Sequence, residues 1–219
     1  MTVKIEKVDA ANPDVKIIEH AAKLILKGEV IVCPTDTGYA FSVNALDSRA
    51  ITRVFQLKGR AFSNPIHIAV GSIEEADNYA QLNAAACYLA SHYLPGALTL
   101  VLKKKETVPS LLVAGLNTVG IRIPDNKVML QLVAKVGKPL TTTSANISGK
   151  PTPYAVDEIV AQLGDSIRNI ALILDQGPLA RRDLSTIIDL SVSPPQLIRQ
   201  GRLSWMDIRE VLKRLQNPE

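Results

Sequence analysis

Apolar residues follow two different spacings along the chain, and the changes between them mark the predicted elements. Between Asn12-Pro13, which favours a helix start with Asn12 as the cap, and Gly28, which favours a helix end, apolar side chains recur every three or four residues. Residues 29–33 then form a short apolar run before Pro34, as in a buried strand that stops at the proline. This part of the chain predicts a helix followed by a buried strand.

The same alternation continues towards the C-terminus. Asp47 is placed to cap a second helix, whose inner face carries Ala50, Ile51, Val54 and Leu57. Further strands are expected at 66–70, 97–102, 119–123, 140–143, 170–174, 186–190 and 196–199, and further helices at 84–94, 127–136, 156–163 and after Ser204. Strands that alternate with helices predict a mixed α/β fold, with one large twisted sheet flanked by helices and antiparallel pairs among the last strands.

Length and composition limit the number of domains and the compartment. The 219 residues, 47% of them hydrophobic, suffice for one core, and no repeat or low-complexity linker divides them, so a single domain over 1–219 is expected. Cys33 and Cys87 lack CxxC or Cys/His spacing, which predicts reduced thiols and no structural zinc. The N-terminus lacks an apolar signal segment and no run of about 18 apolar residues follows, so we expect a cytoplasmic protein without a membrane partner.

Net charge and the common motifs leave the chemistry open. A formal net charge of +4 suits polyphosphate or RNA partners, but it also suits many other proteins. The chain lacks the patterns GxxxxGKS/T, GxGxxG, HExxH and GxSxG, and its histidines, His20, His67 and His92, lie far apart. Candidate residues are therefore sought where predicted strands end, because α/β sheets gather their ligands there.

Two candidate segments follow the first predicted strand and the second predicted helix. Residues 34–39, Pro-Thr-Asp-Thr-Gly-Tyr, offer two hydroxyls and a carboxylate, although a plain turn uses the same residue types. Lys58-Gly59-Arg60, if extended, would place both cations on one side to meet a phosphate, although basic residues also end helices as dipole partners. Read alone, residues 30–70 leave both interpretations open, and they are interpreted as an anion-binding part of an active site only together with the later segments.

Two later segments add polar groups to predicted strands. In the segment 141–149, TTTSANISG, an extended chain would place Thr142, Ser144 and Asn146 on one face, where they would offer uncharged hydrogen bonds to a nucleotide or an amino acid. A Ser/Asn-rich turn is the alternative interpretation. Arg122 lies in an otherwise apolar strand and should meet a carboxylate or phosphate, supplied by the protein or by a ligand.

In their order and approximate spacing, these segments resemble the YrdC-like family of threonylcarbamoyl-AMP synthases, which act in making the N6-threonylcarbamoyladenosine of tRNA. The resemblance covers roughly residues 15–205 and rests on PTDTGY, KGR, TVGIRIP, TTTSANISG, STIIDL and LIRQGR. No single segment is specific, but the ordered set is. It implies the single-domain YrdC-like α/β fold with a deep cavity lined by basic residues.

The resemblance also implies a reaction and its partners. The amine of L-threonine captures bicarbonate or carbon dioxide, and the product attacks the α-phosphorus of ATP to give threonylcarbamoyl-AMP and pyrophosphate, with Mg²⁺ accompanying ATP. Because two anions must be brought together, positioning and electrostatic stabilisation should dominate such a nucleotidyl transfer. RNA, in particular tRNA, and a downstream threonylcarbamoyl-transferase machinery are the further implied partners.

By motif position, the resemblance assigns roles to individual residues. The implied catalytic cations are Lys58 and Arg60. Threonine would be held by Thr37, Arg122, Thr142 and Ser185. ATP would be held by Lys58, Arg60, Asn64, Thr118, Ser144, Asn146 and Arg199. No residue is assigned to a protein-bound metal.

The chain departs from the family pattern at several positions. Residues 38–41 read Gly-Tyr-Ala-Phe where the pattern favours Val-Tyr-Gly-Leu, and Gly-Tyr-Ala is similar to a paralogous branch of the family. That branch tends to lose the Lys-x-Arg and Ser-x-Asn elements, both of which are present here. Ala69 stands where some members have histidine, and Ala61 and Gln200 stand where many have proline.

Two alternatives to the synthase stay open from the sequence. The first is an RNA-binding paralog without this activity, and the second is a paralog that acts on another carbamoyl or acyl substrate. An RNA-binding surface would need more stacking aromatic side chains than a chain with 4% aromatic residues offers, so the enzyme is favoured over the RNA-binding module.

Overall fold

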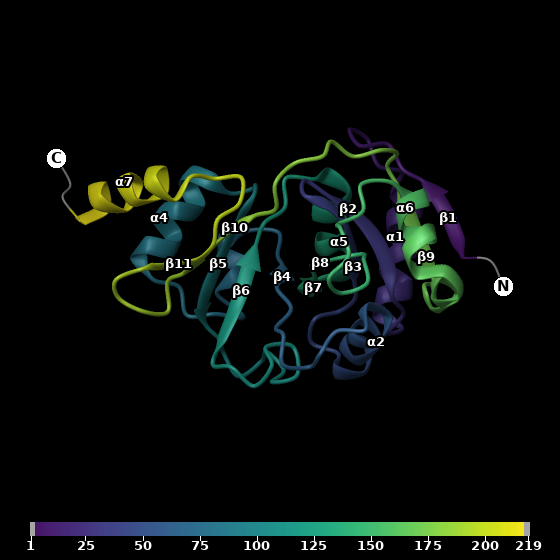
Figure 1. The fold of residues 1–219 in the computed structure, drawn as a ribbon, viewed down its shortest axis with the longest axis horizontal. Coiled ribbons are helices and arrows are strands. Elements are labelled where there is room, and N and C mark those ends of the chain that lie inside the picture. The colour runs from purple at the N-terminus through teal and green to yellow at the C-terminus, as the bar shows by residue number, and fades with distance from the viewer. Residues whose placement is uncertain (1–2, 217–219) are drawn as a thin grey trace.

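The computed structural model describes residues 3–216, which form two β-sheets with helices packed around them (Figure 1). Residues 1–2 and 217–219 of the expected domain lie outside the described part. The helices are α1 (Val15–Leu26), α2 (Ser48–Lys58), α3 (Ile73–Ala76), α4 (Ala84–Tyr93), α5 (Lys127–Val136), α6 (Val156–Leu163), the 3₁₀-helix η1 (Gly164–Asn169) and α7 (Trp205–Gln216). The predicted mixed α/β class is confirmed.

The first sheet has the strand order β1-β9-β2-β3-β8. Its strands are β1 (Lys4–Lys7), β9 (Leu172–Asp175), β2 (Ile31–Thr35), β3 (Gly38–Ser42) and β8 (Thr143–Ser144). β9 runs parallel to both β1 and β2, whereas β3 runs antiparallel to β2 and β8. β2 is buried along its whole length, as its nearly continuous apolar sequence predicts.

The second sheet has the strand order β11-β10-β5-β6-β4-β7. Its strands are β11 (Gln196–Arg199), β10 (Thr186–Asp189), β5 (Leu98–Lys103), β6 (Thr118–Arg122), β4 (Ile68–Ala69) and β7 (Leu140–Thr141). The last two strands, β10 and β11, are antiparallel, which confirms the expectation from their close spacing. β10 and β4 each have one parallel partner, β5 and β6 respectively, so this sheet is mixed as well.

The two sheets meet where a single strand was predicted over 140–143. β7 belongs to the second sheet and β8 to the first, and Thr142 lies between them. The N–H of Thr141 donates to Val43 O at 3.0 Å, and the N–H of Thr142 donates to His67 O at 3.0 Å. The prediction of one large sheet is therefore wrong, because the chain crosses from one sheet to the other at this point.

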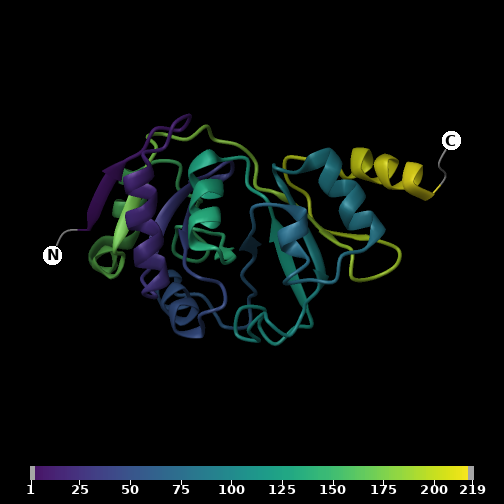
Figure 2. The ribbon, with the colours of Figure 1, turned by 180° about the vertical axis from the view of Figure 1, so that it is seen from behind.

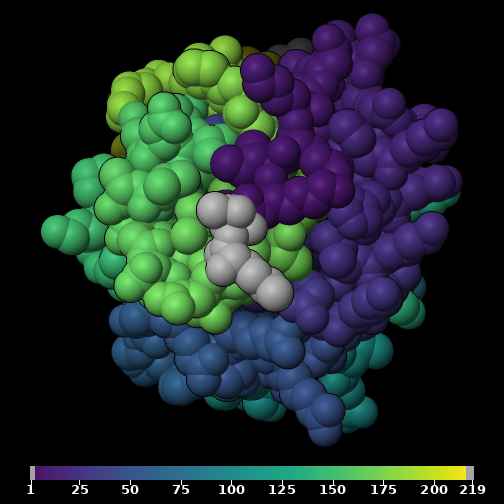
Figure 3. All heavy atoms as spheres, turned by 90° about the vertical axis from the view of Figure 1, so that its right-hand side faces the viewer, coloured from purple at the N-terminus to yellow at the C-terminus, as the bar shows by residue number. Residues whose placement is uncertain are grey.

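Helices cover the two sheets at different ends of the molecule. α1 and α5 lie side by side against the first sheet, and their buried residues share one core cluster (Figure 2). α4 and α7 pack together at the other end, beside the second sheet. Figure 3 shows the end opposite α7, where the edge strand β1 lies between α1 and the helices α6 and η1. No helix within residues 3–216 is long and apolar enough to cross a bilayer.

Some local details differ from the sequence-based expectation. Asp14, not Asn12, caps α1, because its carboxylate accepts a hydrogen bond from Lys16 N at 2.7 Å. Pro34 does not end β2, which continues to Thr35; β9 pairs with β2 only near its start, so the missing N–H of the proline costs no pairing on that side. β1, β3 and α3 were not among the predicted elements.

Candidate active site

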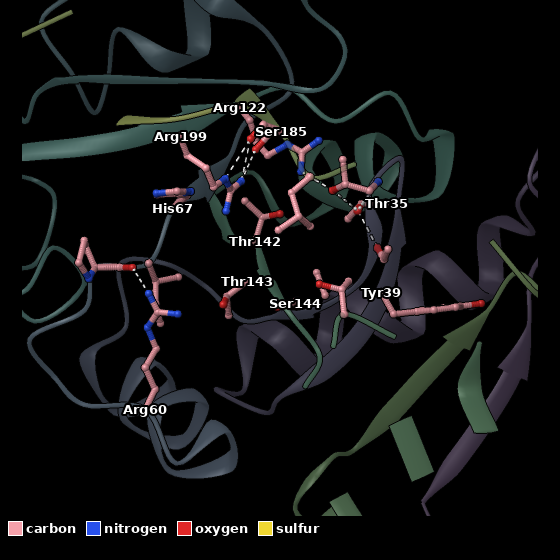
Figure 4. A pocket seen from close by; sticks show the side chains of 17 residues that line it. Thr35, Tyr39, Arg60, His67, Arg122, Thr142, Thr143, Ser144, Ser185 and Arg199 are labelled. Carbon is pink, nitrogen blue, oxygen red and sulfur yellow. Dashed lines mark hydrogen bonds between the residues drawn. The ribbon is translucent and has the colours of Figure 1, made fainter. Parts of the chain in front are cut away.

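Side chains from both sheets line a cavity of about 150 Å³ beside the crossing at Thr142 (Figure 4). Most of the predicted site residues line it: Thr37, Arg60, Arg122, Thr142, Ser144, Ser185 and Arg199. Predicted residues that do not line it are Lys58, Asn64, Thr118 and Asn146. Motifs that lie far apart in the sequence thus converge on one cavity.

A tight turn between β2 and β3 forms one wall of the cavity. Thr35 pairs with Gly38, and its hydroxyl donates to Gly38 O at 2.6 Å and accepts from Thr37 N at 3.2 Å. Gly38 has a φ of +129°, and a Cβ added there would lie 2.5 Å from Thr152 Cγ2. The glycine that departs from the family pattern is therefore required by the close approach of the segment at Thr152.

Arg122, on β6, reaches across to this turn. Its Nη2 donates to Asp36 Oδ1 at 2.7 Å, and its Nη1 donates to the Thr37 hydroxyl at 2.8 Å. The side chains of Arg122 and Asp36 are only 6% and 4% exposed. Burial lowers the pKa of Arg122, and the Asp36 carboxylate acts in the opposite direction. The expectation that Arg122 meets a carboxylate or phosphate is confirmed, with the carboxylate coming from the protein.

Arg199, on β11, is held beside Ser185. Its Nη2 donates to Ser185 O at 2.7 Å and its Nε donates to the same oxygen at 3.2 Å. The Ser185 hydroxyl lies 2.9 Å from the Thr99 hydroxyl on β5. Burial, followed by the charge of Arg122, lowers the pKa of Arg199. Both residues, which the resemblance assigned to the site, therefore face the cavity in fixed orientations.

Lys58 lies at the end of α2, inside the protein. Gly59 adopts the left-handed conformation that ends the helix, with φ of +55°, so the extended geometry considered for Lys-Gly-Arg is not adopted. Lys58 Nζ donates to Ser144 O, to Asn146 O at 3.0 Å and to Asn146 Oδ1 at 2.8 Å. Asn146 Oδ1 also accepts from the Ser144 hydroxyl at 2.6 Å. Lys58 and Asn146 thus hold the segment that presents Ser144 to the cavity.

Arg60 follows the helix end and reaches the cavity separately from Lys58. Its Nη2 donates to Pro65 O at 2.8 Å and its Nε donates to Asn64 O at 3.1 Å. The side chain of Asn64 is exposed, and only its backbone carbonyl takes part in this contact. Thr118 lies at the start of β6, four residues before Arg122, and is not among the residues that line the cavity.

His67 lines the cavity but was not among the predicted site residues. Burial, followed by the charges of Arg199, Arg122 and Arg60, lowers the pKa of the imidazole to about 4. In the sequence, His67 falls inside the strand predicted at 66–70 and not at its end, where the other polar candidates were sought, so its position did not indicate the cavity. A single histidine without a motif around it gave no such indication.

The cavity carries positive charge, but its depth falls short of the expectation. Three arginines, Arg60, Arg122 and Arg199, line it, and its lining contains no aspartate or glutamate. Its volume of about 150 Å³ is below the roughly 300–1,000 Å³ of typical small-molecule sites. The deep basic cavity implied by the resemblance is therefore not confirmed, although the site is suited to small anions.

The chain is similar to known proteins over most of its length. The Sua5/YciO/YrdC family model, described as "Telomere recombination", matches residues 23–201. The chain is 38% identical over 196 residues to the threonylcarbamoyl-AMP synthase of Pyrococcus abyssi, a match that covers 89% of this chain and 57% of that protein. It is also 38% identical over 200 residues to a putative threonylcarbamoyl-AMP synthase of Methanocaldococcus jannaschii, covering 90% and 93% of the two chains.

The fold agrees with these sequence matches. The crystal structure of P. abyssi Sua5 complexed with L-threonine superposes with a TM-score of 0.89 and 36% identity, covering 95% of this chain and 60% of that chain. The chain therefore spans little more than half the length of the P. abyssi protein. The extent of the family match, the identity to two named relatives and the shared fold agree: the chain belongs to the Sua5/YciO/YrdC family.

Proposed function

We propose that the chain is an L-threonylcarbamoyladenylate synthase, a nucleotidyltransferase that forms threonylcarbamoyl-AMP and pyrophosphate from L-threonine, bicarbonate or carbon dioxide, and ATP. The observation that carries this proposal is the convergence of three arginines and several hydroxyl side chains on one cavity. The arginines suit a carboxylate and a triphosphate, and the hydroxyls supply hydrogen bonds without further charge. The names of the similar proteins support the same activity.

Threonine is proposed to bind near the turn between β2 and β3. Arg122 would pair with its carboxylate, because Asp36 and Thr37 already fix the direction of the guanidinium. Thr142 and Ser185 would offer hydrogen bonds to the remaining polar groups of the amino acid. The bound L-threonine named for the similar P. abyssi structure supports this choice of substrate.

ATP is proposed to bind on the side of Arg60, Arg199 and Ser144. The two guanidiniums would stabilise the negative charge that develops as pyrophosphate leaves. Lys58 and Asn146 would not contact ATP directly, because their polar groups form hydrogen bonds inside the protein. They would instead hold Ser144 in the position from which it binds ATP.

Mg²⁺ is proposed to arrive on the triphosphate of ATP. No group of three or more His, Cys, Asp or Glu side chains within residues 3–216 could hold a metal ion on its own. The hydroxyl oxygens of the cavity fit an ion that keeps phosphate oxygens and water as its main ligands. Bound in this way, Mg²⁺ would neutralise charge on the phosphates, while Arg60 and Arg199 orient them.

The product is proposed to supply tRNA modification in the cytoplasm, through a downstream threonylcarbamoyl-transferase machinery. The reaction itself is tested with the purified full chain, ATP, Mg²⁺, bicarbonate and each amino acid in turn, by measuring pyrophosphate. Release should require both threonine and bicarbonate. Arg60→Ala and Arg122→Ala should each reduce the turnover at least about tenfold, whereas Arg49→Ala, an exposed control on α2, should not.

Other outcomes of this experiment would overturn the synthase proposal. Absence of pyrophosphate under every condition, together with tight binding of tRNA, would favour the RNA-binding alternative. Pyrophosphate release that requires a different carbamoyl or acyl acceptor instead of threonine would favour the second alternative.

A further inference from the structure

His67 occupies a fixed position in the wall of the cavity. Ile68 pairs with Ile121 on β6 and with Thr141 on β7, so His67, the preceding residue, lies between Gly120 and Thr142. The hydrogen bond from Thr142 N to His67 O confirms this register. Because β-strands alternate their side chains, His67 lies on the same face of the sheet as Arg122, two residues beyond Gly120.

The ring of His67 rests on a glycine and is surrounded by arginines. A Cβ added to Gly120 would lie 2.4 Å from His67 Cδ2, so the absence of a side chain there makes room for the imidazole. Figure 4 shows the ring beside Arg199, on the same side of the cavity as Thr142. Arg199 directs its hydrogen bonds to Ser185, and Arg122 directs its own to Asp36 and Thr37. Neither neighbouring guanidinium uses its donors on the imidazole.

His67 is the one side chain lining this cavity that presents an uncharged nitrogen base at neutral pH. The other polar lining residues carry hydroxyls, which are very weak bases, or guanidiniums, which are already protonated. The low pKa of about 4 keeps the imidazole neutral, so one ring nitrogen has a free lone pair. The three arginines cause part of this lowering, and two bound anions would offset their charge and raise the proton affinity of the ring.

We propose that His67 is the general base that takes a proton from the α-ammonium group of the amino-acid substrate. This inference rests on the proposed function, in which that amine attacks carbon dioxide. An imidazole lone pair accepts one ammonium proton, and the freed amine lone pair forms the N–C bond to carbon dioxide. The nitrogen then releases its second proton to water at the open side of the cavity, which leaves the N-carboxylate that attacks ATP.

The test compares His67→Gln with wild-type full-length chain and with His92→Gln, an exposed histidine on α4. Glutamine retains hydrogen bonding but accepts no proton. We expect threonine and ATP to bind His67→Gln within about threefold of wild type by calorimetry, while kcat falls about a hundredfold or more, as for loss of a general base. The ratio of variant to wild-type kcat should rise with pH, because more of the threonine amine is then already neutral.

A second variant separates catalysis from folding. His67→Ala should regain part of its pyrophosphate release when imidazole is added, which a purely structural loss would not show. A kcat of His67→Gln within threefold of wild type, or a loss explained by weaker threonine binding alone, would overturn the assignment of the base and leave the synthase standing. Wild-type chain that releases no pyrophosphate with threonine and bicarbonate would overturn both proposals.

Discussion

Arg122 and Asp36 form a buried ion pair that joins the two sheets at the cavity. Arg122 Nη2 lies 2.7 Å from Asp36 Oδ1, and the two residues come from β6 of the second sheet and from the turn after β2 of the first. Such a pair compensates a charge that would otherwise be costly to bury, and it fixes the guanidinium before any ligand arrives. The wall that is proposed to bind threonine is therefore assembled by the ion pair itself.

Breaking this pair from either side should destabilise the fold. Asp36→Asn and Arg122→Gln should each lower the free energy of unfolding by about 3–5 kcal/mol, because each leaves one charge or polar group buried without its partner. The double variant should lose less than the sum of the two single losses, since no charge is then left alone. Urea denaturation of the four proteins measures this coupling. Additive losses would show that the two side chains do not interact.

The sequence predicted the local features of the fold more completely than the sheet arrangement. The bounds of α5 and α6 and the Asp47 cap of α2 follow from residues within a few positions of one another, and all agree with the structure. The division into two sheets depends on which strands pair with one another across long sequence separations. The local spacing of apolar residues does not indicate these pairings. The crossing at Thr142 is one such non-local feature.

The candidate site shows the same division. The sequence predicted that Arg122 pairs with a carboxylate or a phosphate, because a buried arginine needs an anionic partner in any fold. The sequence could not predict that Lys58 and Arg60 point to different places. This separation follows from the left-handed Gly59 and from hydrogen-bond acceptors at Ser144 and Asn146, which lie nearly ninety positions later in the chain. Whether a polar side chain is buried depends on the residues that pack around it, and the spacing of motifs along the chain carries no information about those residues.

Lys58 gives a prediction about the segment that carries Ser144. Lys58→Met fills similar space but removes the Lys58 donor from the backbone oxygens of Ser144 and Asn146, while Asn146 Oδ1 keeps its hydrogen bond from the Ser144 hydroxyl. Since each buried acceptor left unpaired costs about 1–3 kcal/mol, the free energy of unfolding should fall by at least about 2 kcal/mol. The KM for ATP should rise while the KM for threonine changes little. Lys103→Met, on an exposed side chain of β5, is the matched control and should change neither quantity.

His67 predicts a pH dependence of stability that needs no substrate. Its pKa falls from 6.5 to about 4 on folding, so the unfolded chain binds the proton more tightly between these values. The stability that neutral His67 contributes is present above pH 6.5 and is lost as the pH falls towards 4, by up to about 3 kcal/mol. Urea denaturation from pH 7 to pH 4 should therefore show a smaller loss for His67→Gln than for wild type. Parallel pH profiles would contradict the buried neutral imidazole.

Gly201 predicts that backbone packing behind Ser185 is essential to the site. A Cβ added there would lie 2.2 Å from Leu184 O and 2.6 Å from Ser185 C, and these are backbone atoms that cannot rotate away. Gly201→Ala should therefore displace Ser185 and with it Arg199, which is hydrogen-bonded to Ser185 O. We expect a loss of about 2 kcal/mol or more in the free energy of unfolding, since overpacking costs about 1–3 kcal/mol, and a fall in pyrophosphate release.

A second glycine provides the control for this substitution. Gly177 has a φ of +84° and no atom within 4 Å of an added Cβ, so Gly177→Ala adds backbone strain without a clash. It should cost only about 1 kcal/mol, with little effect on pyrophosphate release per folded molecule. Thermal unfolding and pyrophosphate assays of both variants separate the two effects. Equal losses of activity in the two would show that the fall follows general destabilisation, and the packing behind Ser185 would then have no particular role in catalysis.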